Sequence, residues 1–346
     1  MISAKAYGVD NPKGKFKQMT IQRRDPKPDD VVIELAYCGI CHSDIHTARG
    51  EWQGTQYPCI PGHEMVGTVT AVGKKVKKFK VGDLAGVGCL VDSCGKCASC
   101  KNNQEQFCEK GASFSYNSTT SDPGGITYGG YTSHITCKEH FTLKIKKGLP
   151  LDKVAPLLCA GITTYSPLKR YGTKKGKKVG VIGLGGLGHM AVKIAAAMGA
   201  EVTVFSTSPN KEKDAKQLGA KNFLITKDPK NFAAVAGKLD LIIDTVSAPH
   251  DFTPYLQSLK LGGTHVLLGV APTPNELQAG ALIFGHKVLT GSLIGGLKET
   301  QEMLDFCAKK KVFSDIELIT PAQIDVAYDR TVASDVKYRF VIDLKR

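Results

Sequence analysis

The sequence predicts two domains, one mostly β and one of α/β class with a doubly wound parallel sheet. The chain has 346 residues, more than one ordinary hydrophobic core accommodates. Short β-like segments broken by glycine and proline fill residues 1–155, which favours an irregular β domain. Strand-like and helical segments alternate through residues 156–295, as is typical of a parallel sheet built from βαβ units.

In the first domain, two strand-like segments each adjoin a residue that can bind metal. Residues 31–37 begin with β-branched side chains and lead to Cys41. Residues 65–73 form a second β-like stretch, shortly after His63. Together with Cys159, further along the chain, these residues supply two thiolates and an imidazole, which is the donor set of a Cys2His zinc site.

Such a zinc site would be catalytic. Three protein ligands leave a fourth position on the ion for water or substrate. The two thiolates also balance the charge of zinc, which lets the site lie in an apolar cleft. Ser43 and His46 lie within one short turn of Cys41, where a hydroxyl and an imidazole can carry a proton away from a group on the metal.

A second metal site is predicted from a C-x2-C-x2-C-x7-C pattern. Its members are Cys94, Cys97, Cys100 and Cys108. Four thiolates on one loop fit a closed, structural zinc site. An iron–sulfur motif would place the fourth cysteine three residues on, before proline, but here Glu109 follows a gap of seven. A zinc ribbon would separate two knuckles by a longer spacer. The other cysteines are expected to be buried thiols: Cys38, Cys59, Cys89, Cys137 and Cys307.

The second domain begins with a helical pattern at residues 156–162, where Pro156 suits a first helical turn. Residues 178–182 read as a buried strand and residues 189–195 as a helix. Between them lie Gly183, Leu184, Gly185, Gly186, Leu187 and Gly188. In this context, a G-x-G-x-x-G run predicts a dinucleotide site, because it permits a tight turn, close approach of a pyrophosphate, and close packing of helix on strand. The helix N-terminus offers unpaired N–H groups to the phosphates.

Further strand-like segments complete a six-stranded parallel sheet. They are residues 201–206, 222–226, 239–244, 264–269 and 287–293. The pattern changes after residue 296, where a helix over 298–311 is followed by strand-like residues 313–319 and 338–342. The β character of residues 296–346 predicts that they return to the first domain.

The end of the strand at residues 201–206 bears on the choice of dinucleotide. An NAD-binding domain places a carboxylate there for the ribose 2′-hydroxyl, and this chain has none. Ser206 and Thr207 can donate to a 2′-phosphate, and Lys211 adds a positive charge. The alternative is a polar turn that caps the next helix. Glu212 and Asp214 are expected to point outward from that helix.

Composition and charge argue against other classes of protein. The net charge is +14, but the lysines are dispersed, and the densest clusters, at residues 74–78 and 174–178, contain no interleaved aromatic residues for stacking on bases. A zinc-stabilised nucleic-acid-binding protein remains the alternative from a different class, and it would leave the glycine motif unused. No apolar run is long enough for a membrane span. Since the N-terminus lacks the apolar core of a signal peptide, a cytoplasmic protein is expected.

Taken together, these motifs resemble the zinc-dependent medium-chain alcohol dehydrogenases over essentially the whole chain, and within them the cinnamyl alcohol dehydrogenase-like branch. The resemblance implies a GroES-like catalytic domain from residues 1–155 and 296–346, with an inserted Rossmann domain at 156–295. It implies two zinc ions per chain and hydride transfer between NADP(H) and a primary alcohol or aldehyde, with cinnamyl-type substrates among those expected. A polyol dehydrogenase of the same fold is the alternative.

The resemblance also implies roles for individual residues. Catalytic zinc would be bound by Cys41, His63 and Cys159, with Glu64 behind the metal or ligating it. Asp44 would orient His63, and Ser43 and His46 would relay the proton. The structural zinc would be bound by Cys94, Cys97, Cys100 and Cys108. Relatives in this branch are commonly dimers, and residues 287–293 are the expected edge strand through which two Rossmann sheets would join. The other expected partner is a small-molecule alcohol or aldehyde substrate. Neither nucleic acid nor a membrane is expected as a partner.

Overall fold

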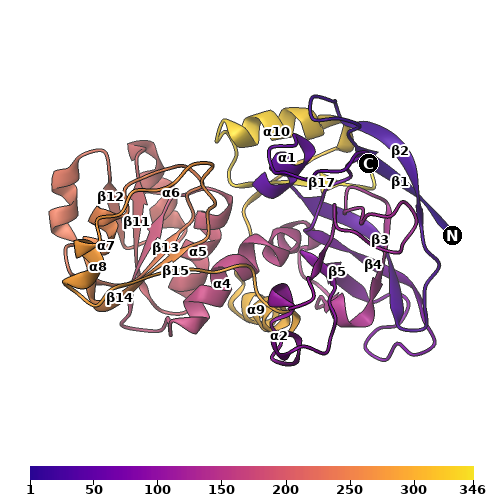
Figure 1. The fold of residues 1–346 in the computed structure, drawn as a ribbon, viewed down its shortest axis with the longest axis horizontal. Coiled ribbons are helices and arrows are strands. Elements are labelled where there is room, and N and C mark those ends of the chain that lie inside the picture. Colours follow the sequence, from indigo (N-terminus) through magenta and orange to yellow (C-terminus); the bar gives the residue numbers. More distant parts are fainter. The chain divides into compact units, whose positions relative to one another are not determined.

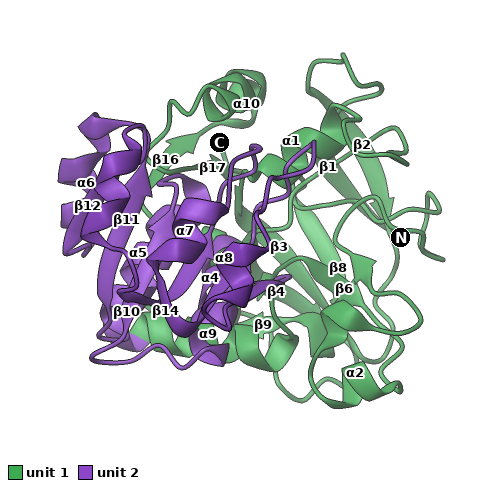
Figure 2. Ribbon diagram, turned by 60° about the vertical axis from the view of Figure 1, so that its left-hand side comes forward, with its two compact units in different colours: residues 1–159, 295–308, 313–346 green, residues 160–294, 309–312 purple.

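The computed structural model describes residues 1–346, which divide into two compact units. Unit 1 contains residues 1–159, 295–308 and 313–346, and unit 2 contains residues 160–294 and 309–312 (Figure 2). Unit 1 is mostly β and unit 2 is α/β, so the predicted fold class is confirmed. None of the helices is long and apolar enough to cross a lipid bilayer.

A seven-stranded sheet forms the centre of unit 1, in the order β16-β17-β3-β4-β5-β9, with β8 also paired to β3. Its strands are β3 (Asp30–Gly39), β4 (Met65–Val72), β5 (Leu84–Val87), β8 (His134–Lys138), β9 (Leu143–Lys144), β16 (Ile316–Ile319) and β17 (Arg339–Asp343). The antiparallel pairing of β17 with β3 joins distant parts of the sequence in one sheet (Figure 1).

The rest of unit 1 consists of two small sheets and short helices. The small sheets pair β1 (Ile2–Gly8) with β2 (Lys17–Arg23) and β6 (Leu90–Asp92) with β7 (Ser113–Phe114). The α-helices are α1 (His42–Ala48), α2 (Ala98–Lys101), α3 (Leu151–Val154), most of α9 (Leu297–Lys310), and α10 (Ile324–Val332). The 3-10 turns are η1 (Glu105–Phe107), η2 (Glu139–Phe141), η3 (Ala155–Leu158) and η6 (Pro321–Gln323).

Two of the differences from the sequence-based prediction concern helices. The helix predicted from residue 156 is instead the 3-10 turn η3, followed by a break at Cys159 and then α4 (Ala160–Arg170). Helix α10 was not predicted. Its buried positions Ile324, Ala327, Tyr328 and Thr331 have the spacing of one helical face, but two of them are polar and the signal is therefore weak.

Unit 2 contains the predicted six-stranded sheet, and all its neighbouring strands are parallel. The order is β12 (Asn222–Ile225), β11 (Glu201–Ser206), β10 (Lys178–Ile182), β13 (Leu239–Asp244), β14 (Leu259–Leu267) and β15 (Val288–Gly291). The remaining elements are α4, α5 (Gly186–Ala197), η4 (Pro209–Lys211), α6 (Glu212–Gln217), η5 (Pro229–Ala234), α7 (Thr253–Ser258) and α8 (Gly280–Ile283). The inner strands β10, β11 and β13 are buried and rich in Val, Ile and Leu. Phe205 of β11 and Leu256 of α7 belong to one core cluster.

Candidate active site

Four buried side chains of unit 1 converge on one point. The ligand atoms of Cys41, His63, Glu64 and Cys159 lie within 4.8 Å of one another. Cys41 begins helix α1 just after strand β3, and Cys159 occupies the break between η3 and α4. His63 and Glu64 directly precede β4. The predicted ligand set is therefore assembled from three separate segments, and its two thiols and imidazole fit a zinc ion.

Asp44 ties two of these segments together. Its Oδ1 accepts hydrogen bonds from His63 Nδ1 and from the Gly62 amide, both over 3.1 Å, and its Oδ2 accepts one from the Cys41 amide over 2.8 Å. The carboxylate is completely buried. Because Nδ1 of His63 is used in this way, Nε2 is left for a metal. The geometry fits the orienting role expected for Asp44.

Tyrosines form a further layer around Asp44. The Tyr131 hydroxyl donates to Asp44 Oδ2 over 3.4 Å, and the Tyr328 hydroxyl donates to that of Tyr131 over 3.2 Å. The Tyr116 ring lies 5.6 Å from the His63 ring. These contacts were not predicted, because nothing in the sequence around the three tyrosines indicates that they meet.

Glu64 forms a buried ion pair that was not predicted either. Its Oε1 accepts a hydrogen bond from Arg339 Nη2 over 2.7 Å, and its Oε2 has no partner. Burial raises the pKa of Glu64, and the positive charge of Arg339 opposes that rise. Oε2 also fills the space beside Gly39, where a Cβ would lie only 1.9 Å away. A free, buried carboxylate oxygen beside two thiols and an imidazole suits a metal ion.

The two thiols of the cluster are unlike. A hydrogen bond from the Cys159 thiol and the charge of Arg339 hold the pKa of Cys41 well below its usual range, and the same contact raises the pKa of Cys159. The prediction that Cys89 is buried is wrong, since Cys89 is only half-buried. A hydrogen bond from the Cys159 thiol also lowers the pKa of Cys89. The position after β5 (Leu84–Val87) brings Cys89 to the cluster.

The predicted relay residues lie on α1. Cys41 Sγ is 3.8 Å from Ser43 Oγ. His46 is further along the helix, where its Nδ1 is 2.5 Å from Glu51 Oε2 and its ring stacks on Trp52 at 5.1 Å. The His46 side chain is 29% exposed, so it can exchange a proton with solvent. His42, for which no role was predicted, has its ring 6.0 Å from that of His46.

The four predicted lobe cysteines also form one cluster. The Sγ atoms of Cys94, Cys97, Cys100 and Cys108 lie within 4.8 Å of one another, and all are free thiols. Amide hydrogen bonds from Lys96 and Cys97 lower the pKa of Cys94 to about 6. N–H groups aimed at sulfur stabilise a thiolate, which fits a closed zinc site. Nearby, buried Glu105 accepts hydrogen bonds from His140 and from the Leu297 amide, which ties this lobe to α9.

In unit 2, the glycine motif forms the turn between β10 and α5. Gly183 has a φ of +85°, and a Cβ at Gly188 would lie 2.2 Å from the Gly183 carbonyl oxygen. A Cβ at Gly185 would meet open space. Lys211 Nζ donates to the Leu184 carbonyl over 3.3 Å, so this lysine reaches the turn. These positions fit close approach of a dinucleotide phosphate to the backbone.

The polar residues after β11 support two interpretations. Ser206 Oγ accepts a hydrogen bond from the Ser208 amide over 3.1 Å, so it also shapes the turn. Thr207 is exposed beside it. Glu212 is exposed and pairs with Lys216 over 2.7 Å, away from the strand end. Glu212 therefore does not occupy the strand end.

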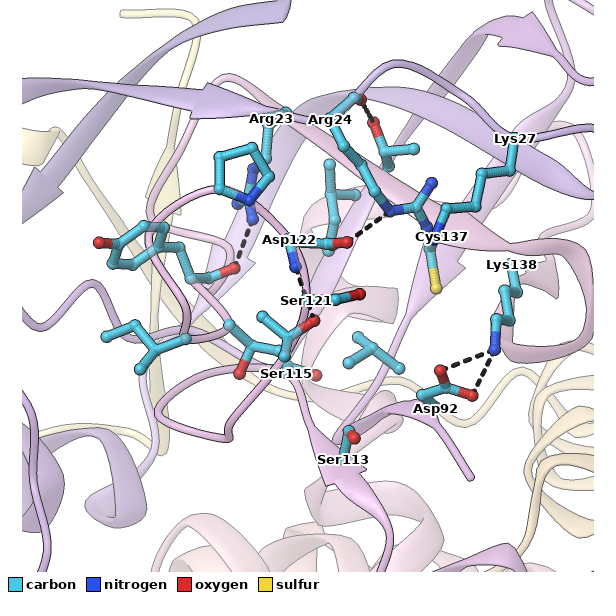
Figure 3. A pocket seen from close by; sticks show the side chains of 18 of the residues that line it. Arg23, Arg24, Lys27, Asp92, Ser113, Ser115, Ser121, Asp122, Cys137 and Lys138 are labelled. Carbon is cyan, nitrogen blue, oxygen red and sulfur yellow. Dashed lines mark hydrogen bonds and ion pairs between the residues drawn. The ribbon is translucent and has the colours of Figure 1, made fainter. Parts of the chain in front are cut away.

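A polar cavity between β2, β8 and residues 113–128 contains none of the predicted site residues (Figure 3). Several of its charged side chains are bound by neighbours within the protein. Arg24 Nε pairs with Asp122 over 2.9 Å, Lys138 Nζ pairs with Asp92 over 2.6 Å, and Arg23 donates to the Tyr128 carbonyl over 2.7 Å. We therefore assign this cavity no part in the chemistry.

The fold and the two cysteine-containing clusters define a zinc-binding oxidoreductase of the alcohol dehydrogenase class. The sequence profile of the "Alcohol dehydrogenase GroES-like domain" family matches residues 27–147, and that of the "Zinc-binding dehydrogenase" family matches residues 186–309. The chain belongs to the zinc-dependent medium-chain alcohol dehydrogenases, in the cinnamyl alcohol dehydrogenase-like branch.

Individual relatives agree with this assignment. The chain is 52% identical to NADP-dependent alcohol dehydrogenase C 1 of Mycolicibacterium smegmatis, over 99% of this chain and 98% of the relative. It is 50% identical to aldehyde reductase YahK of Escherichia coli, over 99% and 98% of the two chains. A solved cinnamyl alcohol dehydrogenase of Sorghum bicolor superposes with a TM-score of 0.96 and 43% identity, over 99% of this chain and 98% of that one.

Proposed function

We propose that this protein reduces aldehydes and oxidises primary alcohols with NADP(H) in preference to NAD(H), and that aromatic, cinnamyl-type compounds are among its substrates. The observation that carries the proposal is the buried group of Cys41, His63 and Cys159 in a chain whose second unit holds Lys211 against a dinucleotide-type glycine turn. The similar proteins named as NADP-dependent alcohol dehydrogenase, aldehyde reductase and cinnamyl alcohol dehydrogenase support it.

The residues of unit 1 have distinct proposed roles. Cys41, His63 and Cys159 hold the catalytic zinc, with Glu64 Oε2 as a further donor, and Asp44 holds His63 in the required orientation. Cys94, Cys97, Cys100 and Cys108 hold the structural zinc. When bound, zinc supplies a Lewis acid for the substrate oxygen, and the nicotinamide supplies or accepts the hydride.

Proton movement is assigned to α1. Ser43, beside Cys41, exchanges a proton with the substrate oxygen, and His46 exchanges it with solvent. Glu51, at Nδ1 of His46, fixes the ring so that Nε2 serves as the other proton site. In aldehyde reduction the proton enters along the same path.

In unit 2, residues Gly183 to Gly188 accept the pyrophosphate. Ser206, Thr207 and Lys211 contact the 2′-phosphate, through two hydroxyl donors and one ammonium. The exposure of Thr207 and the reach of Lys211 to the Leu184 carbonyl support this proposal.

A homodimer is also proposed, through the edge strand β15. β15 pairs only with β14 and ends the sheet. Apolar side chains gather in and before it: Ile283 is 68% exposed, Phe284 92% and Val288 44%. An apolar sheet edge favours pairing with another strand, here that of a second copy. Sedimentation equilibrium tests this: a monomer at micromolar concentration would contradict it.

The test of the proposed function is a substrate panel with the zinc-loaded protein. Aromatic and aliphatic aldehydes, primary alcohols and polyols are each assayed with NADPH or NADP⁺ and with NADH or NAD⁺. We expect aldehyde reduction with NADPH to have the highest kcat/KM. Turnover of polyols with NAD⁺ as the best reaction would indicate the polyol dehydrogenase alternative. No turnover, with retention on nucleic acid that falls with salt, would indicate a nucleic-acid-binding protein.

A further inference from the structure

Unit 2 contains a buried cluster of one aspartate and two histidines that the proposed mechanism does not use. Asp244 is the last residue of β13 and is 1% exposed. Its Oδ2 is 2.9 Å from His250 Nε2 and 3.0 Å from His265 Nε2. Its Oδ1 accepts a hydrogen bond from the Val246 amide over 3.1 Å. One carboxylate oxygen thus serves two imidazoles.

The partners of His250 determine its charge. Its Nε2 faces the Asp244 carboxylate, and its Nδ1 lies 2.8 Å from the Ala248 carbonyl oxygen. Both partners can only accept, so both contacts are hydrogen bonds only when His250 is an imidazolium. Burial opposes this charge, but the hydrogen bond to Asp244 and its negative charge raise the pKa of His250 above 6.5.

His265 differs from His250. It donates from Nε2 to Asp244, while its Nδ1 is buried without a hydrogen-bond partner. Asp244 and His250 form the charged pair of the cluster. The other groups against His250 are Asp251, the Phe252 ring at 5.0 Å, the Tyr255 ring at 5.7 Å, and the Asn275 side chain, which accepts from the His250 amide.

The contacts of His250 with Asp244 and with the Ala248 carbonyl close residues 245–250 into a loop. This loop lies against the glycine turn. Thr245 donates from its amide and from its hydroxyl to the Ile182 carbonyl, over 3.1 and 2.7 Å. A Cβ at Gly183 would lie 3.0 Å from Val246 Cγ2 and 3.1 Å from Thr245 Oγ1. The loop is therefore in contact with the first glycine of the turn, and any shift of residues 245–246 changes the surface that a dinucleotide meets.

We propose that His250 is a positioning residue for the dinucleotide: its imidazolium, bound to Asp244 and to the Ala248 carbonyl, fixes the 245–250 loop against the glycine turn, and loss of its proton weakens dinucleotide binding. A neutral His250 has one N–H and must give up one of its two hydrogen bonds. The 245–250 loop is then held by fewer hydrogen bonds and becomes less ordered. Part of the free energy of dinucleotide binding must be used to order the loop again, so binding is weaker. The inference rests on the proposed function in taking residues 183–188 as the dinucleotide site.

The experiment measures the Kd of NADPH by isothermal titration calorimetry with the zinc-loaded protein, from pH 6 to pH 9. Wild type is compared with His250→Gln and with the control His286→Asn, an exposed histidine of the same unit. The phosphate of NADPH also titrates in this pH range, and its effect on Kd is the same for variant and wild type. The ratio of the two Kd values is therefore free of that effect. We expect His250→Gln to bind about tenfold more weakly at pH 6 and to converge with wild type by pH 9, with the control equal to wild type throughout.

Two further measurements examine the Asp244 partner and the protonation of His250 directly. Asp244→Asn removes the charge partner and is expected to weaken binding at pH 6 as His250→Gln does. The His250 ring proton, assigned in NMR spectra by its loss in His250→Gln, is expected to titrate above pH 6.5 without any cofactor. A Kd ratio that is constant with pH, or titration below that value, would overturn the inference while leaving the proposed function intact. Wild type that binds no dinucleotide at any pH would overturn both.

Discussion

Arg339 Nη2 donates a hydrogen bond to Glu64 Oε1 over 2.7 Å, although 275 positions separate the two residues in sequence. The Arg339 and Glu64 side chains are 4% and 0% exposed. Neither charge has access to bulk water, so each depends on the other. The pair joins β17 to the segment that carries the proposed ligand His63.

Removal of Arg339 should therefore destabilise the protein strongly. Arg339→Met leaves the Glu64 carboxylate buried and unpaired, and we expect the free energy of unfolding to fall by about 3–5 kcal/mol. Urea denaturation measures this. Arg346→Met, which removes a surface ion pair with Asp343, is the matched control and should change little. Equal effects of the two substitutions would show that the buried pair has no special role.

Two zinc ions with unequal roles are expected per chain. Cys41→Ala should lose one zinc ion and all turnover while the protein stays folded. Cys100→Ala should lose the other and mainly lower stability or solubility, because its cluster fixes a loop and not a substrate. Elemental analysis and thermal unfolding measure both. One zinc ion, or iron, in the wild-type protein would contradict this prediction.

His46→Gln should keep both zinc ions and slow alcohol oxidation most at low pH. There, solvent base is scarce and the relay carries the proton. The measurement is kcat for alcohol oxidation from pH 6 to pH 9. If the variant stays within about twofold of wild type over that range, His46 is a surface histidine packed on Trp52 and not part of the relay.

Cofactor choice should depend on the residues after β11. Wild type is expected to prefer NADPH to NADH by at least about tenfold in kcat/KM, as one charge-assisted contact provides. Ser206→Asp combined with Lys211→Ala should lose or reverse this preference, because a carboxylate then repels the 2′-phosphate. Equal efficiencies in wild type would mean that these residues only form a turn.

The Asp244–His250 pair should stabilise the protein over a defined pH range. The pKa of His250 is raised on folding, so its contribution is complete below its ordinary value of 6.5 and is lost as pH rises through the folded value. The pKa of Asp244 is lowered, so its contribution is lost only as pH falls below 3.8. The difference in unfolding free energy between wild type and His250→Gln should thus shrink from pH 6 to pH 9. A difference that grows with pH would contradict the assigned charges.

Much of the fold and of the proposed site could be predicted from residues that are close together in the sequence. The glycine turn, its flanking strand and helix, and the four-cysteine lobe each depend on residues close together in the chain, so spacing alone predicts them. The pairing of Glu64 with Arg339 could not be found in this way, because it depends on β17 lying next to β3. A lone arginine in the apolar strand Arg339–Asp343 was the available signal.

The cluster around Asp244 could not be predicted either, because it also depends on how the strands pair. His265 reaches Asp244 because β14 runs parallel to β13 in a register that pairs His265 with Ile242. Neither the spacing nor the composition of these strands sets that register. Cys89 is a similar case: its half-buried place beside Cys159 follows from the turn after β5, not from the apolar residues that flank it in sequence.

The position of β17 between β16 and β3 has a consequence for biosynthesis. Cys41, His63, Glu64 and Cys159 all leave the ribosome before Arg339 is made. Until then, Glu64 has no counter-charge, and strand β3 lacks β17 as its neighbour on one side. In a nascent chain halted before residue 339, unit 2 should therefore be folded and unit 1 should be cleaved by protease. Unit 1 can complete its fold only when Arg339, the counter-charge of Glu64, has been made.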